Sequence, residues 1–196
     1  MKYIIIINPH SGKKKGREIL NQIKPIFDSN HITLEIIETK YAKHAKKIAH
    51  QMNLDQYDGL LGIGGDGTLN EIINGMLKRE DNKNIPIGLI PGGTGNSYLH
   101  DLKLTNPINV VEKIINKKMQ LMDVAQIEIN NKISYAMNMI GWGLVTDIGN
   151  KAEKFRWLGT RRYTILSIFE VFTHNSRSAT LIMEKETIKD NFTFII

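Results

Sequence analysis

The stretch Gly62–Glu71, which reads Gly-Ile-Gly-Gly-Asp-Gly-Thr-Leu-Asn-Glu, is the most informative about the fold of this chain. An apolar run that begins at Gly59 leads into it and is typical of a strand end. Apolar residues at helical spacing come next: Leu69, Ile72, Ile73, Met76 and Leu77. A glycine-rich turn between a strand and a helix lets main-chain N–H groups approach an anion closely. The stretch therefore predicts a phosphate-binding loop, and a tight turn with an aspartate cap is the alternative.

The loop contains one acid, Asp66. A carboxylate repels phosphate, so we expect no direct contact between the two. Its chemistry suits it to hold Mg²⁺ or to accept a proton from an attacking hydroxyl group. We therefore predict that Asp66 is a catalytic residue.

Composition narrows the class of protein. The chain has 196 residues, which is enough for one domain and part of a second. A content of 41% hydrophobic and 23% charged residues is typical of a globular protein. It has no cysteine, which excludes disulfides and thiolate zinc sites. No apolar stretch has the length of a membrane span. The net charge of +6 suits a polyanionic ligand or an anionic membrane surface, and we expect a cytoplasmic protein.

The first half of the chain alternates between strand and helix patterns. Strands are predicted at residues 2–8, 33–38, 59–63 and 85–90, and helices at 16–27, 42–52 and from 69 onward. Asn106 and Pro107 have the residue types of a helix start, and that helix is predicted to reach Ile115. The alternation predicts an α/β fold of three layers, with a mostly parallel sheet between helices.

From about Leu121 the pattern changes to β-rich. Strands are predicted at 123–129 and 133–140 around an Asn130-Asn131 hairpin turn, a helix at 162–172, and strands at 179–184 and 192–196. We place a domain boundary between residues 119 and 120. The chain stops on Phe-Ile-Ile with no polar cap, so we expect the second domain to be a sheet that has begun but lacks its remaining strands, and hence a truncated chain.

Two more loops rich in glycine follow predicted strands. One is Asn8–Gly12 and the other is Pro91–Ser97, which also opens a helix. Loops after parallel strands gather at the carboxyl edge of a sheet, where ligands bind. Neither has the Gly-x-x-x-x-Gly-Lys pattern of a P-loop. We predict that the three loops converge on a nucleotide.

Together, the motifs Asn-Pro-x-Ser-Gly at 8–12, Gly-Gly-Asp-Gly-Thr-Leu-Asn-Glu at 64–71 and Pro-Gly-Gly-Thr-Gly-Asn at 91–96 resemble the diacylglycerol kinase catalytic-domain family of lipid kinases. The similarity continues through Met122–Val124 and Gly141–Asp147. It reaches Glu153–Tyr163, which is particularly similar to sphingoid-base and ceramide kinases.

The resemblance implies an ATP-dependent kinase that uses Mg²⁺. It also implies an α/β nucleotide domain followed by a β-sandwich lipid domain, with the site between them. Asp66 matches the proposed base for the lipid hydroxyl, and Asp123 matches an acid important in bacterial members. The positions that match nucleotide-contacting residues are Asn8, Thr39, Gly65, Glu71, Gly93, Thr94, Asn96, Arg156 and Arg162. To these we add loop residues predicted to bind the cofactor: Ser11, Gly64, Gly67, Thr68 and Gly95. The metal ligands stay unassigned.

Structural alternatives exist for several of these side chains. Glu71 could cap a helix or form a salt bridge, and Asn96 could be an ordinary helix N-cap. Asp123 could bind a neighbouring backbone group. The arginines Arg156 and Arg162 could pair with Glu153 or Asp147. The apolar segment 163–172 could line an acyl-chain pocket or pack as a buried helix.

The lipid substrate is predicted from one departure from the family pattern. Sphingosine kinases have an acid for the lipid amine two positions beyond the match to Asp147, and here that position is Gly149. A diacylglycerol-like lipid is therefore favoured over sphingosine.

The expected partners are ATP and a lipid at a membrane surface, with no nucleic acid, and a homodimer is left open. The alternatives are an NAD kinase-like enzyme and an inactive nucleotide- or lipid-binding fragment, because a later Gly-Asp-Gly-Glu-like segment has no counterpart here.

Overall fold

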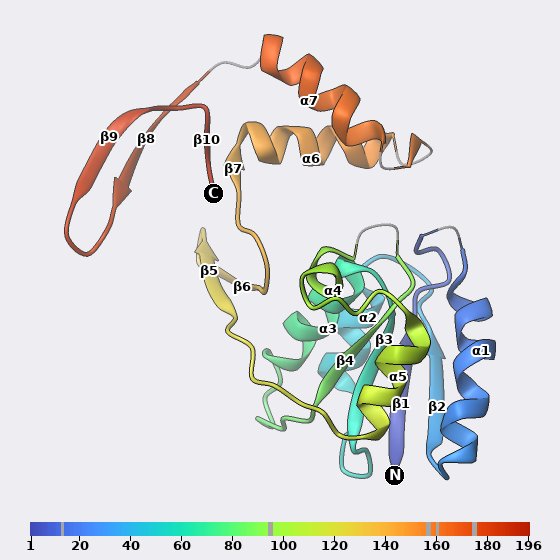
Figure 1. Ribbon diagram of the computed structural model, residues 1–196. Helices are drawn as coiled ribbons and strands as arrows, with labels where there is room; N and C mark the ends of the chain where they lie inside the picture. Colours follow the sequence, from blue (N-terminus) through green and yellow to red (C-terminus); the bar gives the residue numbers. More distant parts are fainter. Residues whose placement is uncertain (13, 94–95, 156–157, 160, 174–175) are drawn as a thin grey trace. The chain divides into compact units, whose positions relative to one another are not determined.

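The computed structural model describes residues 1–12, 14–93, 96–155, 158–159, 161–173 and 176–196 (Figure 1). The chain divides into two compact units, Met1–Asn138 and Met139–Ile196. The first contains a four-stranded parallel sheet, and strands follow two helices in the second. This arrangement confirms the predicted fold class.

The sheet of the first unit has the strand order β2-β1-β3-β4. Its strands are β1 (Lys2–Ile7), β2 (Thr33–Glu38), β3 (Gly59–Gly64) and β4 (Ile87–Pro91). All three pairings are parallel, and β1 pairs with β2 on one side and β3 on the other. The strand order reverses between β1 and β3, and open α/β sheets bind ligands at the carboxyl ends of the strands beside such a reversal.

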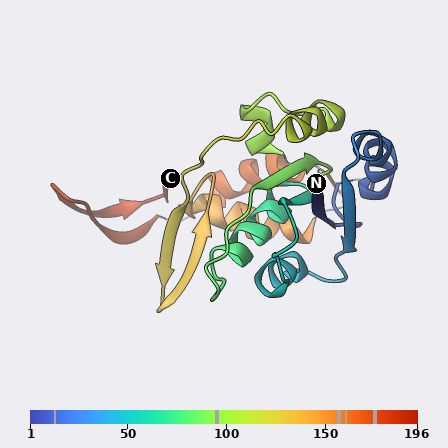
Figure 2. The ribbon, with the colours of Figure 1, turned by 90° about the horizontal axis from the view of Figure 1, so that it is seen from below.

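Helices cover both faces of this sheet. One face is covered by α1 (Gly16–Ser29) and α5 (Pro107–Ile115), and the other by α2 (His44–Gln51) and α3 (Asp66–Met76). Figure 2 looks along the strands and shows α5 and α2 on opposite sides. The isoleucines of β1 alternate between the two cores, since Ile5 and Ile7 face α1 while Ile4 and Ile6 face α2. A strand buried on both faces needs the continuous apolar run that β1 has.

The first unit continues with the short helix α4 (Ser97–Asp101), then α5, and closes with a hairpin of β5 (Ala125–Ile129) and β6 (Lys132–Ala136). The side chain of Asn106 accepts hydrogen bonds from the N–H groups of Ile108 and Asn109 at 2.8 and 3.4 Å, so the predicted cap of α5 is confirmed. Asn130 and Asn131 both have positive φ, as the predicted hairpin turn requires. The strands are shorter than predicted: β5 begins at Ala125, and β6 ends at Ala136.

The second unit contains β7 (Trp142–Gly143), α6 (Leu144–Lys154), α7 (Arg161–Thr173), β8 (Arg177–Ile182), β9 (Thr187–Phe192) and β10 (Phe194–Ile195). Its strands pair antiparallel, β8 with β9 and β7 with β10. The sequence did not predict α6 or β9. The strand predicted at 192–196 is shorter in the structure, where β10 covers Phe194–Ile195. Within the described residues, no helix combines the length and apolar character that crossing a membrane requires.

Candidate nucleotide site

Three loops meet at the carboxyl edge of the sheet in the first unit, as the sequence predicted. The N–H groups of Gly92 and Gly93 both donate to the carbonyl of Gly64, at 2.8 and 3.0 Å. The N–H of Asn8 donates to the carbonyl of Ile63 at 3.1 Å. The loops after β1 and β4 are therefore both bonded to the end of β3.

Ser11 joins the first loop to the third. Its side chain is buried, and its hydroxyl Oγ lies 3.0 Å from the carbonyl oxygen of Asn8 and 3.2 Å from that of Gly92. A hydroxyl has one proton, so the two carbonyls share a single donor. The side-chain oxygen of Asn8 accepts the N–H of His10 at 3.0 Å, which closes the first loop on itself.

Two glycines allow this close packing. A Cβ on Gly93 would lie 2.5 Å from the Cα of Gly65, and a Cβ on Gly12 would lie 2.6 Å from the carbonyl oxygen of Gly92. Gly12 also has a φ of +56°, which side-chain-bearing residues rarely adopt. By contrast, a Cβ on Gly67 would meet nothing within 4 Å. The backbone at the start of α3 is therefore open on that side.

The start of α3 has the properties of an anion site. Gly65 is the N-cap residue and makes no side-chain cap bond. The first N–H groups of a helix have no partner within the helix and have a partial positive charge. Behind them, the buried Thr68 packs against Gly64. A glycine-lined turn that leads into this helix is suited to bind phosphate.

Asp66 is half-buried in the first turn of α3 and binds the start of α4. One carboxylate oxygen accepts the N–H of Ser97 at 2.8 Å, and the other accepts the N–H of Tyr98 at 3.2 Å. These bonds connect the second loop to the helix that follows the third. A carboxylate accepts about four hydrogen bonds, so two of its acceptor positions remain for other groups.

Asn96 is the N-cap residue of α4, as the structural alternative anticipated, but its side chain makes no cap bond to that helix. Its side-chain amide Nδ2 donates to the carbonyl of Gly93 at 3.0 Å. Its side-chain oxygen Oδ1 is buried and has no hydrogen-bond partner within the described residues. A buried acceptor without a donor is costly, and a ligand that supplies a donor would relieve that cost.

Thr39 and Glu71 lie next to α2. Thr39 is buried after the end of β2, and its N–H donates to the carbonyl of Ile7 at 2.8 Å. Glu71 accepts the N–H groups of Lys43 and Ala45 at 2.9 and 3.1 Å, as the cap alternative anticipated. Burial, followed by the charges of Lys78 and Lys43, lowers the pKa of Lys46 in the first turn of α2.

The other predicted residues lie elsewhere. Asp123 is exposed in the segment before β5. Arg162 belongs to the second unit, where it donates to the hydroxyl of Tyr163 at 3.0 Å. Three predicted residues, Thr94, Gly95 and Arg156, lie outside the described residues, as does the side chain of Glu153. Asp147 binds Arg177 at 2.7 Å.

Sequence reasoning missed a pair of asparagines that bind the hairpin to α3. The side-chain amide of Asn74 donates to the carbonyl of Tyr135 at 2.8 Å, and its oxygen accepts the N–H of Tyr135 at 2.9 Å. Asn70 donates to the same carbonyl at 3.2 Å. Two asparagines four positions apart, and therefore on one side of the predicted helix, were the available signal. Within the described residues, no three acidic or histidine side chains gather into a metal site.

Comparisons with known proteins fit this geometry. Residues 2–127 match the family described as the diacylglycerol kinase catalytic domain. Sphingosine kinase 1 of Arabidopsis thaliana is 39% identical over 178 residues, which cover 85% of this chain and 36% of that protein. Ceramide kinase of Homo sapiens is 29% identical over 196 residues, which cover 91% of this chain and 36% of that protein. The chain thus spans little more than a third of the length of these relatives.

A similar fold occurs in solved structures. A crystal structure of a putative diacylglycerol kinase from Bacillus anthracis str. Sterne aligns with a TM-score of 0.75 and 24% identity. The alignment covers 98% of this chain and 63% of that one. At this level of identity the likeness shows the fold.

Proposed function

This chain belongs to the diacylglycerol kinase catalytic-domain family, and on that premise we propose that the protein is an ATP-dependent lipid kinase. The observation that supports the proposal best is that three loops are hydrogen-bonded together at the carboxyl edge of the sheet. There the N–H groups of Gly92 and Gly93 donate to the carbonyl of Gly64. A triphosphate needs several hydrogen-bond donors in one place, and three loops that meet can supply more of them than one turn.

The residues present fit a nucleotide in two respects. The open side of Gly67 leaves room for phosphate against the start of α3. Among the residues that the structure describes, the buried Oδ1 of Asn96 has no donor, and a nucleotide can supply one. ATP would provide the phosphoryl group that is transferred. The residues assigned to hold it are Asn8, Ser11, Thr39, Gly64, Gly65, Gly67, Thr68, Glu71, Gly93, Thr94, Gly95, Asn96, Arg156 and Arg162.

Asp66 is assigned to accept the proton of the lipid hydroxyl. Its bonds to the N–H groups of Ser97 and Tyr98 fix the orientation of the carboxylate and leave acceptor positions for that proton. Asp123 is proposed as the second acid of the site. Mg²⁺ is proposed as cofactor because such sites bind it through one or two carboxylates plus the phosphates, which requires no cluster of three acids.

In this proposal residues 1–119 form the nucleotide domain and residues 120–196 begin the lipid domain. The hairpin β5–β6 lies on the lipid side of that boundary and is bonded to α3 through Asn74. We propose that the protein is cytoplasmic and acts at a membrane surface. The apolar side chains of α7 support contact with lipid, since Ile168, Phe169 and Phe172 are exposed within their unit.

For the lipid we propose a neutral alcohol of the diacylglycerol type. Gly149 lies on α6, and a Cβ there would meet nothing within 4 Å, so this position offers open space and no carboxylate for an ammonium group. The relatives named sphingosine kinase are the reason to test sphingosine beside it. Ceramide, which has an amide in place of the amine, is the third lipid to compare.

The test is a phosphorylation assay of the protein with ATP and a panel of diacylglycerol, ceramide, sphingosine and NAD. We expect transfer to diacylglycerol at the highest rate and no transfer to NAD. Asp66→Ala should lower the rate by about 10²-fold or more, because general base catalysis contributes that much. Transfer to NAD alone would overturn the proposal in favour of an NAD kinase, and ATP binding without transfer would favour a binding module.

Asp66→Asn serves as the matched variant. It keeps one acceptor oxygen for the start of α4 but cannot accept a proton, so it should lose the same activity as Asp66→Ala with a smaller loss of stability. Thermal unfolding of both variants separates the two effects. Full activity in a folded Asp66→Asn protein would contradict the assigned base.

A further inference from the structure

The outer edge of β6 is bonded to side chains of α3 and not to another strand. Within the described residues β6 pairs with β5 alone, so one of its edges presents backbone groups that no strand takes up. The N–H of Tyr135 donates to Oδ1 of Asn74 at 2.9 Å, and its carbonyl accepts from Nδ2 of the same side chain at 2.8 Å. The carbonyl of Ile133 accepts from the ammonium group of Lys78, just after α3. Helix side chains thus take the place of a neighbouring strand.

The repeats of the two elements match along this contact. Residues four apart on a helix are about 6 Å apart along its axis, and residues two apart on a strand are about 6.6 Å apart. Asn74 and Lys78 are four apart, and their partners Tyr135 and Ile133 are two apart. Asn70, one turn earlier, adds a bond at 3.2 Å to the carbonyl of Tyr135. These bonds therefore fix the register of the hairpin on α3.

The side chain of Asn74 is committed to this contact. Its amide has two N–H groups, and Nδ2 lies 2.8 Å from the carbonyl of Tyr135 and 2.9 Å from that of Asn70. The residue is 5% exposed. It comes eight positions after Asp66, which is about 12 Å along the helix axis. Asn74 is therefore too far from the start of α3, and too well buried, to bind a ligand there.

The hairpin depends on contacts of this kind for its position. A two-stranded hairpin is marginally stable by itself in water, so the surface it packs against decides where it lies. Apolar residues between positions 122 and 137 pack against a buried cluster that includes Leu69 and Ile73 of α3. Apolar packing is not directional, whereas hydrogen bonds are. The bonds from Asn74 supply the direction that apolar packing lacks.

The same helix begins with the proposed base. Asp66 is the first residue of α3, while the hairpin starts two residues after Asp123 and is the first element of the proposed lipid domain. Resting on the proposed function, we propose that Asn74 is a positioning residue. It holds the β5–β6 hairpin in register on α3, so that the lipid side of the protein is aligned with Asp66. Its loss impairs transfer to the lipid and leaves ATP binding intact.

The first measurement is amide hydrogen exchange without ligands. Asn74→Leu keeps roughly the size of the side chain but removes both bonds to Tyr135, so the amide of Tyr135 should exchange about tenfold faster. Asn70→Ala removes only the 3.2 Å bond and should act in the same direction more weakly. It replaces the first variant if that one does not fold. Unchanged exchange at Tyr135 in the folded variants would overturn the proposal, whether or not the protein is a kinase.

The second measurement compares the two substrates. Asn74→Leu should lower kcat/KM for diacylglycerol by about tenfold or more, because small misplacements of reacting groups are costly. The Kd for ATP, measured by isothermal titration, should stay within about twofold of the wild type, because the nucleotide loops are bonded to one another at Gly64 and Gly92 and not to the hairpin. An equal loss of ATP affinity would show that Asn74 supports α3 as a whole, and would overturn the assigned role.

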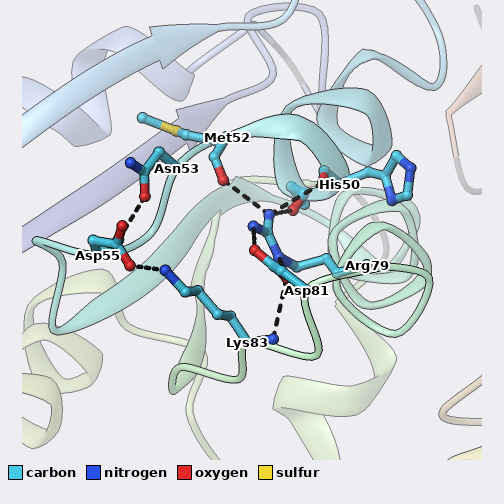
Figure 3. A network of polar contacts seen from close by, with 8 residues as sticks. His50, Met52, Asn53, Asp55, Arg79, Asp81 and Lys83 are labelled. Carbon is cyan, nitrogen blue, oxygen red and sulfur yellow. Dashed lines mark hydrogen bonds and ion pairs between the residues drawn. The ribbon is translucent and has the colours of Figure 1, made fainter.

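Arg79→Met is the matched control for a general loss of stability. Arg79 also follows α3 and has a side chain that is 5% exposed, but it bonds to α2 and not to the hairpin. Its Nη1 donates to three carbonyls at the end of α2, those of Ala49, His50 and Met52, at 2.8, 3.1 and 2.9 Å (Figure 3). Arg79→Met should leave kcat/KM for diacylglycerol and exchange at Tyr135 within about twofold of the wild type. Equal losses in both variants would mean that destabilisation causes the effect, and the positioning role would be overturned.

The third measurement separates positioning from direct contact with the lipid. A positioning residue predicts the same fold loss for Asn74→Leu with every lipid that the wild type phosphorylates, so diacylglycerol, ceramide and sphingosine are compared. A loss confined to one lipid would indicate that Asn74 contacts it and would overturn the proposal. If the wild type phosphorylates none of the three, the proposed function fails and the positioning role fails with it. If the wild type is active and Asn74→Leu is equally active, the positioning role alone is overturned.

Discussion

The two units of this chain bury their apolar residues very differently. In the first unit β1 provides Ile4–Ile7, all with no exposed surface, and helices enclose it on both faces. In the second unit the apolar side chains of α7 remain exposed, among them Val171 at 64% and Phe172 at 85%, while the buried residue of that helix is an acid, Glu170. Hydrophobic spacing thus predicts an element in both units, but it predicts the buried face only where the unit supplies the opposing surface.

The largest effect should come from the core of the first unit. Phe27→Ala removes a side chain with no exposed surface that packs against β1, and should lower the free energy of unfolding by about 3–5 kcal/mol. Phe172→Ala, with the same change of chemistry, should stay within about 0.5 kcal/mol of the wild type. Urea unfolding of both variants measures the change in the free energy of unfolding. Equal decreases in the two variants would contradict the difference in burial between the two units.

The next largest effect should be a loss of ATP affinity when the packing of the glycine-rich loops is disturbed. Gly93→Ala places a Cβ 2.5 Å from the Cα of Gly65, so the second and third loops must separate. We expect affinity for ATP to fall by about tenfold or more, corresponding to at least about 1.4 kcal/mol. Isothermal titration with ATP measures the affinity, and thermal unfolding measures the loss of stability that we expect from the same clash.

Gly67→Ala is the control for that substitution. Its Cβ has open space, and alanine favours a helix over glycine by about 1 kcal/mol, so thermal stability should be retained or rise slightly. A loss of stability in Gly67→Ala as large as that in Gly93→Ala would show that any substitution disturbs these loops.

A smaller effect should follow from the buried acid of the second unit. Glu170 is 3% exposed and binds Lys151 of α6, whose side chain is about half exposed. Glu170→Gln should destabilise the packing of α7 on α6 by about 1–2 kcal/mol, because the charge-assisted bond is weakened. Hydrogen exchange of the α7 amides measures it, with the exposed Glu184→Gln as control. Slower exchange in Glu170→Gln would show that the buried charge is a net cost.

The smallest effect should be a dependence on pH at Asp81. The hydrogen bond from Arg79 holds the pKa of this carboxyl below its usual value. A group with a lowered folded-state pKa stabilises the protein above its unfolded pKa of about 4 and loses that contribution as the pH falls through the folded value. The difference in urea midpoint between wild type and Asp81→Asn should therefore be constant above about pH 5 and shrink in stronger acid. A difference that grows on acidification would contradict the assignment.

Particular elements show how far the sequence could be trusted. The bounds of β2 and the cap of α5 at Asn106 were predicted correctly, since both depend on residues adjacent in the chain. The helix α6 was missed because its first residues follow a glycine motif that was interpreted only through its family resemblance. The convergence of the three loops was predicted because parallel strands force their carboxyl ends to one edge.

The sequence by itself determined a parallel α/β unit with glycine turns after β1, β3 and β4, because hydrophobic period and glycine placement act locally. Only the tertiary structure decided what the acids beside those turns bind. Asp66 reaches the start of α4, and Glu71 reaches the start of α2, although each partner lies more than twenty residues away in the chain. Side-chain hydrogen bonds depend on distances of about 3 Å, which packing sets and residue order does not.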